Sequence, residues 1–173
     1  MTDIPVLVTE RLVLRGFRLD DLDALTAMWA LPETVRYIGG TPQTREQSWA
    51  RLPRHIGMWN LMGFGVWAVT ERTSGRLVGQ AGFHEMRCDL TPSIEGTLEA
   101  GWGLLPDVQG RGYASEALQA IMSWAAANHP DKAITCIIDP DNAASIRLAE
   151  RHSFREVARA AYQESEVIIL RRM

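Results

Sequence analysis

Several features that define particular protein classes are scarce in this chain of 173 residues. It has only two cysteines, Cys88 and Cys136, and their spacing is not that of a metal site, so we expect neither a disulfide framework nor a bound metal. No apolar run approaches the roughly 20 residues that a membrane-spanning helix needs. The start, MTDIPVLVTERL, lacks the basic region and apolar core of a secretion signal. We therefore expect a cytoplasmic protein with no membrane segment.

The chain also lacks an excess of positive charge. Its 18 Lys and Arg against 21 Asp and Glu give a formal net charge of −3, and no basic and aromatic stripe runs along it. These features argue against nucleic acid as a partner. Hydrophobic residues at 46% and charged residues at 23% are ordinary for a folded domain. Because no repeat, low-complexity tract or linker interrupts the sequence, we expect one domain spanning residues 1–173.

The order of periodic segments predicts the fold class. Strand-like alternation or short apolar runs occur at 8–17, 63–71, 76–86, 97–105, 133–139, 154–162 and 165–171. Between them lie helical stretches that we expect to begin at Asp20, at the capping box of Thr44 and Gln47, after Gly112, and at Asn142. The order predicts an α+β fold in which about four helices pack on one mixed sheet.

Prolines and glycines predict the interruptions of these elements. Pro32 should follow the end of the first helix, and Pro53 should break or kink the second near Leu52. Gly101 and Gly103, inside the strand 97–105, predict either a bulge or a close approach of another backbone.

The stretch PDVQGRGYASEA, residues 106–117, places glycine backbone where a helix is expected to begin. A helix N-terminus leaves about four N–H groups unpaired and carries roughly half a positive charge, which suits a phosphate. Gly110 and Gly112 would let the backbone approach such a ligand, while Arg111 adds a charge and Ser115 a hydroxyl. An ordinary strand-to-helix turn explains the glycines equally well. A Walker loop does not fit because no Gly-Lys-Ser/Thr follows, and a Rossmann fingerprint fails at Ser115.

Three separated segments carry a resemblance to a known family. Residues 109–114, Gln-Gly-Arg-Gly-Tyr-Ala, match the pattern Q/R-x-x-G-x-G/A, and residues 142–154 match N-x-x-S-x-x-x-x-E-x-x-G-F except at Ser153. The third segment is TERLVLR, residues 9–15, near the start of the chain, and it is typical of one branch of the same family. Over nearly its whole length the sequence resembles the GNAT acyl-CoA-dependent N-acetyltransferases, in particular the branch that acetylates ribosomal-protein N-termini.

The resemblance implies a fold and a cosubstrate. The fold is a mostly antiparallel, twisted sheet of about seven strands that splays between the fourth and fifth. Acetyl-CoA would lie in the splay, with its pyrophosphate on the amides of residues 110–115 and its pantetheine paired with the strand ending at Leu104. The residues implied in binding it are Leu104, Leu105, Gln109, Gly110, Arg111, Gly112, Tyr113, Ala114, Ser115, Asn142 and Ser145. Asn142 can equally be a helix cap, and both roles are compatible.

Acetyl transfer to an amine needs a neutral amine and a donor for the developing oxyanion. By resemblance, the backbone N–H near Leu104 is that donor. Glu99 on the same strand is the candidate base, acting directly or through a water, with His84 and Glu85 as rivals on the preceding strand. Each of these three side chains can also be purely structural.

The chain departs from the family pattern at two positions. Many GNAT enzymes carry a tyrosine acid seven residues after the asparagine, where this chain has Ala149, which leaves Ser145 or water as the proton donor. Ser153 stands where glycine usually precedes Phe154, which should cost some turn stability.

The segment that resembles the acceptor-gating region of the family is rich in tryptophan. Trp29, Trp49 and Trp59 belong either to the core, the commoner place for tryptophan at helical positions, or to the acceptor pocket. Cys136, within an apolar strand, is interpreted as core packing.

The function that follows is an N-acetyltransferase whose acceptor is a protein N-terminus or a small-molecule amine. A non-catalytic acyl-CoA-binding module is the alternative. Neither nucleic acid nor membrane is expected as a partner, and the chain is expected to be a monomer or a homodimer.

Overall fold

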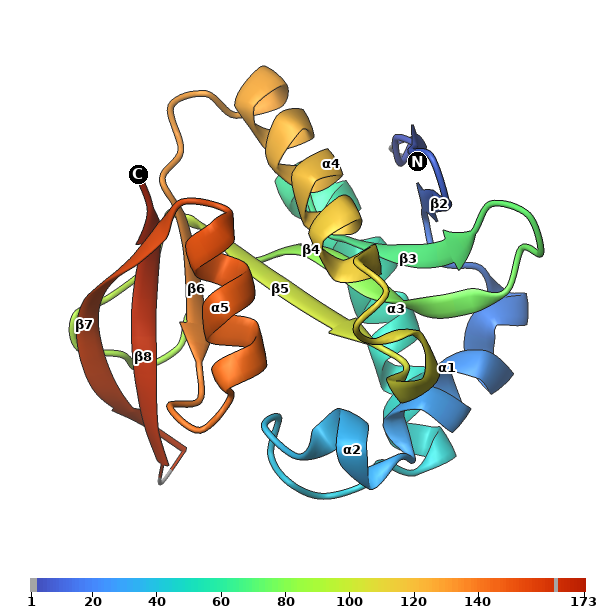
Figure 1. The fold of residues 1–173 in the computed structure, drawn as a ribbon, viewed down its shortest axis with the longest axis horizontal. Coiled ribbons are helices and arrows are strands. Elements are labelled where there is room, and N and C mark those ends of the chain that lie inside the picture. The colour runs from blue at the N-terminus through green and yellow to red at the C-terminus, as the bar shows by residue number, and fades with distance from the viewer. Residues whose placement is uncertain (1–2, 164) are drawn as a thin grey trace.

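The computed structural model describes residues 3–163 and 165–173, which form one eight-stranded mixed sheet in the order β1-β2-β3-β4-β5-β6-β8-β7 (Figure 1). The strands are β1 (Leu7–Val8), β2 (Leu12–Arg15), β3 (Val66–Glu71), β4 (Leu77–His84), β5 (Leu98–Leu104), β6 (Ile134–Ile138), β7 (Phe154–Tyr162) and β8 (Ser165–Arg172). All neighbouring pairs are antiparallel except β5 and β6, which are parallel. The expected α+β class and mostly antiparallel sheet are confirmed.

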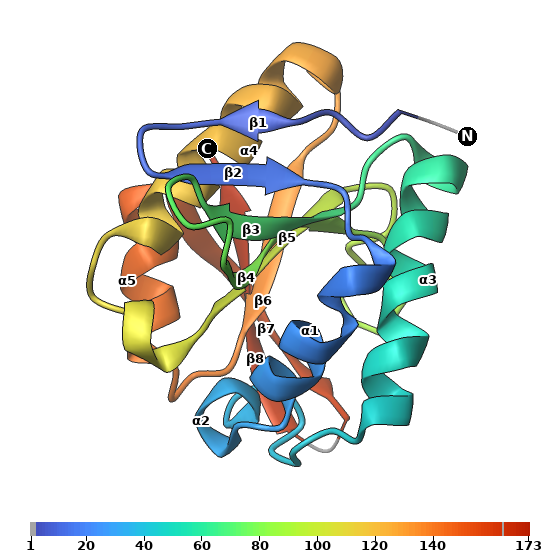
Figure 2. The same ribbon diagram turned by 90° about the vertical axis from the view of Figure 1, so that its right-hand side faces the viewer.

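Helices cover both faces of the sheet. They are α1 (Leu22–Trp29), α2 (Pro32–Val35), α3 (Arg45–Met62), α4 (Tyr113–Asn128) and α5 (Ala143–Arg151). Figure 2 shows α4 and α5 on one side and α1 and α3 on the other, with the short α2 near one end of the sheet. Within residues 3–163 and 165–173, no helix has the length and apolar character needed to cross a membrane.

The two parallel strands stay together only where they begin. Leu98 lies opposite Ile134 and Glu99 opposite Thr135, and these are the two register pairs of β5 with β6 in the described part of the chain. Beyond them β5 continues beside β4, whereas β6 continues beside β8. The sheet therefore opens between β5 and β6 (Figure 1), which confirms the splay expected between the fourth and fifth predicted strands.

The first predicted strand, 8–17, is wrong as a single element. It is a hairpin of β1 and β2 in which Leu7 lies opposite Leu14. Thr9 makes the turn, because its N–H donates to the Leu12 carbonyl at 2.9 Å and its hydroxyl oxygen accepts from the Leu12 N–H at 3.0 Å. Leu12 and Leu14 of β2 belong to the core, where both are completely buried.

The predicted cap at Asp20 is also wrong. A 3-10 turn, Leu19–Asp21, precedes α1, and the carboxylate of Asp21 accepts the Arg18 N–H at 2.7 Å. Arg15 donates to both oxygens of the same carboxylate at 2.7 Å, and these bonds hold the pKa of Asp21 below its usual value despite its burial. Asp21, and not Asp20, is therefore the aspartate that accepts the backbone N–H before α1, and the partly buried guanidinium of Arg15 holds its carboxylate in place.

Prolines act as expected at one position and not at the other. α1 ends at Trp29, before Pro32, although Pro32 then begins α2. α3 opens on the predicted capping box, with Thr44 Oγ1 accepting from Gln47 N and Gln47 Oε1 accepting from Thr44 N. The break expected at Pro53 is wrong, because α3 runs unbroken through it. The helix thus continues without the backbone bond that a residue other than proline would donate to the Trp49 carbonyl.

The bulge considered for the β5 glycines is absent from the described pairing of β5 with β4, and the close backbone approach is at Gly79 of β4. The register of β5 on β4 is continuous from Glu99 to Leu104, without a shift. A Cβ on Gly79, the β4 residue opposite Leu104, would lie 2.3 Å from the Gly103 carbonyl oxygen. The two backbones therefore pack too closely here for a side chain on Gly79.

Candidate functional site

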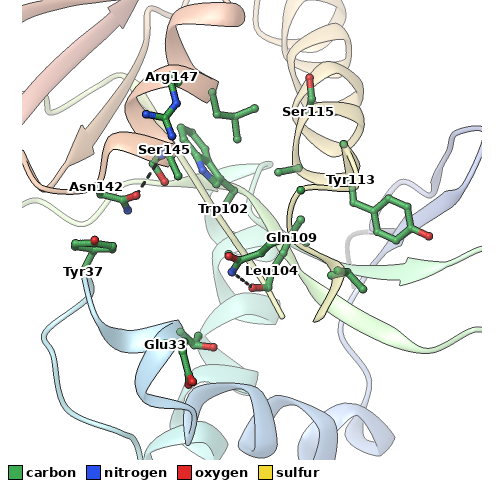
Figure 3. Close-up of a pocket in the computed structure, with 18 of the residues that line it drawn as sticks. Glu33, Tyr37, Trp102, Leu104, Gln109, Tyr113, Ser115, Asn142, Ser145 and Arg147 are labelled. Atoms are coloured by element: carbon green, nitrogen blue, oxygen red, sulfur yellow. Dashed lines mark hydrogen bonds between the residues drawn. The ribbon is translucent and has the colours of Figure 1, made fainter. Parts of the chain in front are cut away.

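A pocket of about 450 Å³ opens where β5 and β6 separate. Its volume is within the range of about 300–1,000 Å³ that is usual for small-molecule sites. Its walls come from the end of β5, the turn before α4, the first turn of α4, α5 and α2 (Figure 3). Of the residues expected to bind a cosubstrate, those that line it are Leu104, Gln109, Gly110, Gly112, Tyr113, Ala114, Ser115, Asn142 and Ser145.

The turn and first residues of α4 present a run of free backbone donors to this pocket. Gln109 N donates to Pro106 O and Glu116 N to Gly112 O, but between them no backbone N–H of residues 110–115 has an acceptor in the described part of the chain. Gly110 and Gly112 have φ values of 74° and 81°, in the left-handed region that disfavours side chains. Successive amides with such dihedrals form a concave, electropositive cradle for an anion. Residues 110–115 are called the cradle below.

Backbone groups at the end of β5 also face the opening. Leu105 N donates to Val78 O on β4 at 2.9 Å, and successive residues of a strand direct their backbone groups to opposite edges. The N–H and C=O of Leu104 therefore point away from β4, toward the side that β6 has left. Gln109 Nε2 donates to the Leu104 carbonyl at 3.0 Å (Figure 3), which leaves the Leu104 N–H as the free donor.

The start of α5 forms the opposite wall. Asn142 caps α5, with its Oδ1 accepting from Ser145 N at 3.1 Å, so the expected capping role is confirmed. The Ser145 side chain lies beside Asn142 at the pocket (Figure 3).

The two positions that depart from the family pattern lie outside the pocket lining. Ala149, at the position of the absent tyrosine, is completely buried in the core. Ser153 has a φ of 68°, so a residue with a side chain occupies the left-handed conformation that glycine usually takes.

The hairpin at the start of the chain holds the cradle from behind. The carboxylate of Glu116, in the first turn of α4, accepts from Thr9 Oγ1 at 2.6 Å, Arg11 N at 2.8 Å and Arg11 Nε at 2.7 Å. Arg11 Nη1 also donates to the Arg111 carbonyl at 2.8 Å. These contacts tie the segment that carries the TERLVLR pattern to the cradle, and they pair a carboxylate near the helix N-terminus with a cation. Thr9, Arg11 and Glu116 are called the latch below.

Two of the expected cosubstrate-binding residues lie outside the pocket lining. Leu105 uses its N–H on β4, and Arg111 directs its guanidinium toward Glu71, with Nη1 4.0 Å from Oε1, and toward the Tyr113 ring. Tyr113 contributes to the lining, but its hydroxyl donates to Glu71 at 3.3 Å and points away from the pocket (Figure 3). The expected roles of the Leu105 backbone and the Arg111 charge therefore have no support from the geometry and stay predictions.

Glu99 is partly buried at the last point of contact between β5 and β6. It lies opposite His84 on β4 and Thr135 on β6. Burial raises the pKa of its carboxyl group to about 7. No hydrogen bond or ion pair within residues 3–163 and 165–173 involves that carboxylate. A carboxyl that titrates near neutral pH suits a general base.

The two rivals of Glu99 are less suited to that chemistry. Burial, with the charges of Arg54 and Arg51 adding to it, lowers the pKa of His84 to about 4, which makes it a weak base near neutral pH. The carboxylate of Glu85 lies 3.4 Å from Arg87 Nη2. Since it directly follows His84, Glu85 also starts from the opposite face of the sheet.

Alternation along β5 separates Glu99 from the pocket that holds the cradle. The side chains of Trp102 and Leu104 start from the face of the pocket, which Gly103 lines with its backbone, while the Glu99 side chain starts from the other face. Glu99 is not among the pocket-lining residues. A group in the pocket and a group reaching Glu99 would therefore meet through the opening between β5 and β6.

Several lining residues were not found from the sequence. Trp102, between Gly101 and Gly103, and Glu33 and Tyr37 around α2 face the pocket (Figure 3). The flanking glycines were a usable signal for Trp102. No local pattern marks Glu33 or Tyr37, because α2 is only four residues long and its place is set by tertiary packing.

The tryptophans proposed as alternatives for the acceptor pocket have other positions. Trp59 is a core residue whose Nε1 donates to Val66 O at 3.2 Å. Trp29 is buried beneath Arg51, whose guanidinium lies 3.7 Å from its ring centre, and Trp49 is 47% exposed. None of the three lines the pocket. The interpretation of Cys136 as core packing is confirmed, since it is buried and burial raises the pKa of its thiol.

The buried carboxyl of Glu99 predicts a pH-dependent cost to stability. Its pKa is about 7 when folded against an ordinary 4.5, so the folded protein holds this proton more tightly than the unfolded chain. The cost of burial is therefore absent below pH 4.5, grows as the pH rises and is complete above about 7, at roughly 3 kcal/mol at most. Glu99→Gln should raise the melting temperature at pH 8.5 and change it little at pH 4.5. The exposed Glu46→Gln on α3 is the control, and a Glu99→Gln effect that is the same at both pH values would contradict the raised pKa.

Comparison with known proteins agrees with this geometry. The model of the acetyltransferase (GNAT) domain matches residues 11–155. A Bordetella pertussis protein whose structure is described as a GNAT-family acetyltransferase is 31% identical, with a TM-score of 0.86 and coverage of 98% of this chain and 99% of that one. The N-acetyltransferase p20 of Bacillus licheniformis, itself uncharacterized, is 28% identical over 87% of this chain and 82% of its own.

A third similarity concerns the fold alone. The ribosomal L7/L12 alpha-N-protein acetyltransferase RimL, solved in complex with coenzyme A, has a TM-score of 0.79 at 18% identity, with 98% of each chain covered. Family model, relatives and fold lead to the same conclusion: the chain belongs to the GNAT acetyltransferases.

Proposed function

We propose that this acetyltransferase moves the acetyl group of acetyl-CoA directly to a primary amine, without a covalent intermediate on the protein. The observation that carries the proposal is the run of unpaired amides at residues 110–115, facing the pocket where β5 and β6 separate. Free amides at a helix N-terminus suit a pyrophosphate. The free edge of β5 suits an extended amide-bearing chain such as pantetheine, which can pair there as a strand would.

Three groups of the chain then divide the chemistry. Acetyl-CoA supplies the thioester. The Leu104 N–H stabilises the oxyanion that develops on the acetyl oxygen. Glu99 removes the proton from the attacking nitrogen, directly or through a water, and Ser145 or water returns a proton to the departing sulfur.

This assignment requires the amine to approach from the face of α1 and α3, because Glu99 points there. Glu33 is a second candidate base, since its carboxylate lies at the same pocket as Asn142 and Ser145 (Figure 3). The raised pKa of Glu99, to about 7, favours Glu99, because a base is most effective when it titrates near the working pH.

The acceptor is a protein N-terminus or a small-molecule amine. The fold shared with RimL is consistent with the first, and fold similarity does not by itself select an acceptor. The alternative function, a non-catalytic acyl-CoA-binding module, draws on Ala149 standing where a tyrosine acid is common in the family.

The test is release of free thiol from acetyl-CoA in the presence of a panel of small amines and N-terminal peptides. Amine-dependent thiol release with a matching acetylated product supports the enzyme and identifies the acceptor class. Tight binding of acetyl-CoA with no turnover on any member of the panel would favour the binding module.

The conformation of Gly112 predicts a selective loss of CoA binding. Gly112→Val puts a β-branched side chain at a φ of 81° in the cradle, 3.3 Å from Arg11 Nη2 at its Cβ. The dissociation constant for CoA should rise, measured by calorimetry. Gly75→Val is the control, because it imposes similar strain at a φ of 71° in a turn with no neighbour within 4 Å of its Cβ. Unchanged CoA affinity in folded Gly112→Val would show the cradle to be an ordinary turn.

The latch predicts a non-additive double-mutant cycle. Arg11→Met removes a bond to the Arg111 carbonyl and leaves the Glu116 carboxylate uncompensated near the pyrophosphate site, so CoA affinity should fall roughly 5- to 10-fold. Adding Glu116→Gln removes that charge, so Arg11→Met/Glu116→Gln should bind CoA better than Arg11→Met alone. If the double variant binds no better, the latch acts through packing and not through charge.

The two candidate proton-transfer residues should differ in their effects. Glu99→Gln is expected to lower turnover roughly 10²-fold near neutral pH, and the loss should shrink as the pH rises because solvent deprotonates more of the amine. Ser145→Ala should cost roughly 10-fold, through cosubstrate positioning. The measurement is a pH–rate profile at saturating acetyl-CoA, with Glu33→Gln alongside. Greater damage from Ser145→Ala would make the serine the proton donor, and greater damage from Glu33→Gln would move the base to α2.

A further inference from the structure

The pocket has few positive side chains for a ligand as anionic as CoA. CoA carries a pyrophosphate and a separate phosphate on the ribose 3′ position. The cradle offers backbone N–H groups, and Arg111 is turned toward Glu71. Among the described residues that line the pocket, the cationic side chains are Arg147 and Arg151.

Both arginines belong to one face of α5. They are four residues apart, so their side chains project from the same side of the helix. Arg151 Nε donates to the Arg147 carbonyl at 3.2 Å, which fixes its stem and leaves its terminal nitrogens unused. The Arg147 guanidinium lies at the pocket above Ser145 (Figure 3).

The end of α5 lies against the cradle. Ser115 Oγ, in the first turn of α4, is 2.8 Å from Nε2 of His152, the residue after Arg151. Burial, followed by the charges of Arg172 and Arg151, lowers the pKa of His152, so the positive charge of Arg151 is close enough to act on this ring. A ligand whose pyrophosphate rests on the cradle thus has Arg151 as its neighbour on the α5 side.

Arg147 and Arg151 differ from several other arginines of the chain in their ion pairing. Neither Arg147 nor Arg151 forms an ion pair in residues 3–163 or 165–173, whereas Arg11, Arg15, Arg45, Arg76 and Arg159 each contact a carboxylate. A second, open hollow adjoins on the other side of the pair and is lined by Arg147, Glu150, Arg151 and Arg155. The two guanidiniums therefore stand between the pocket and a solvent-facing recess with room for a nucleotide end.

We propose that Arg147 and Arg151 bind the ribose 3′-phosphate of CoA and make the protein discriminate against CoA that lacks it. The inference rests on the proposed use of acetyl-CoA. Guanidinium–phosphate contacts are charge-assisted and directional, so they add affinity for the phosphorylated ligand alone. The cradle then binds the pyrophosphate, which both forms of CoA share.

The experiment compares CoA with 3′-dephospho-CoA by calorimetry, on the wild-type chain, Arg147→Met, Arg151→Met and the double variant. The wild type should bind CoA roughly 10-fold or more tightly than 3′-dephospho-CoA. In the double variant the two affinities should come within about twofold, through weaker binding of CoA and an unchanged affinity for 3′-dephospho-CoA. The preference of the wild type should also weaken as salt is added.

Arg159→Met is the matched control, because it removes one arginine from β7, where Arg159 pairs with Glu156 and Glu166, and it should keep the wild-type preference. Equal binding of both ligands by the wild type would overturn the proposal, as would an equal loss for both ligands in the double variant, which would assign the arginines to the pyrophosphate. Failure of folded wild type to bind either ligand would instead remove the proposed use of CoA, and this inference with it.

Discussion

The site depends on backbone hydrogen-bonding groups that secondary structure leaves unpaired. β5 and β6 pair over two residues and then separate, so the edge of β5 keeps free groups in the interior of a sheet rather than at its border. The cradle adds amides that no part of the described chain accepts. Unpaired donors of this kind cost free energy unless a ligand or water satisfies them. The free edge of β5 and the cradle are therefore two parts of one site, since both supply hydrogen-bond donors to the same pocket.

The residues around these donors keep the electrostatics of the two faces distinct. On the cradle side, the latch neutralises Glu116 so that the helix N-terminus keeps its attraction for anions. On the other face, Glu99 forms no ion pair within the described residues, and burial raises the pKa of its carboxyl. The pKa of Glu116 is lowered by its bonds to the Thr9 hydroxyl and to the backbone and side chain of Arg11, whereas the pKa of Glu99 is raised by its deeper burial.

The sequence predicts well what local chemistry decides. Gly110 and Gly112 have the left-handed conformations that the turn required, Asn142 caps α5, and the order of elements follows their periodicity. Prediction failed where tertiary structure, and not local sequence, determines the outcome. Arg15 pairs with Asp21, although the sequence predicted a cap at Asp20, and α3 continues through Pro53. Residues around α2 reach the pocket through packing of a segment with no pattern of its own. The roles of individual side chains toward CoA remain predictions, because geometry around a site does not test chemistry.

The latch has a consequence for the order in which the site becomes complete. Thr9 and Arg11 contact Glu116 across 107 and 105 residues of chain, and the opposite wall of the pocket belongs to α5, later still. Contacts between residues so far apart in sequence form late in folding, because closing the intervening loop costs conformational entropy before the contact contributes any stabilisation. A chain in which β3, β4 and β5 have paired but the first hairpin has not docked would possess a sheet without a firm cradle. Ligand affinity should consequently report on the docking of the hairpin of β1 and β2 more sensitively than the content of secondary structure does.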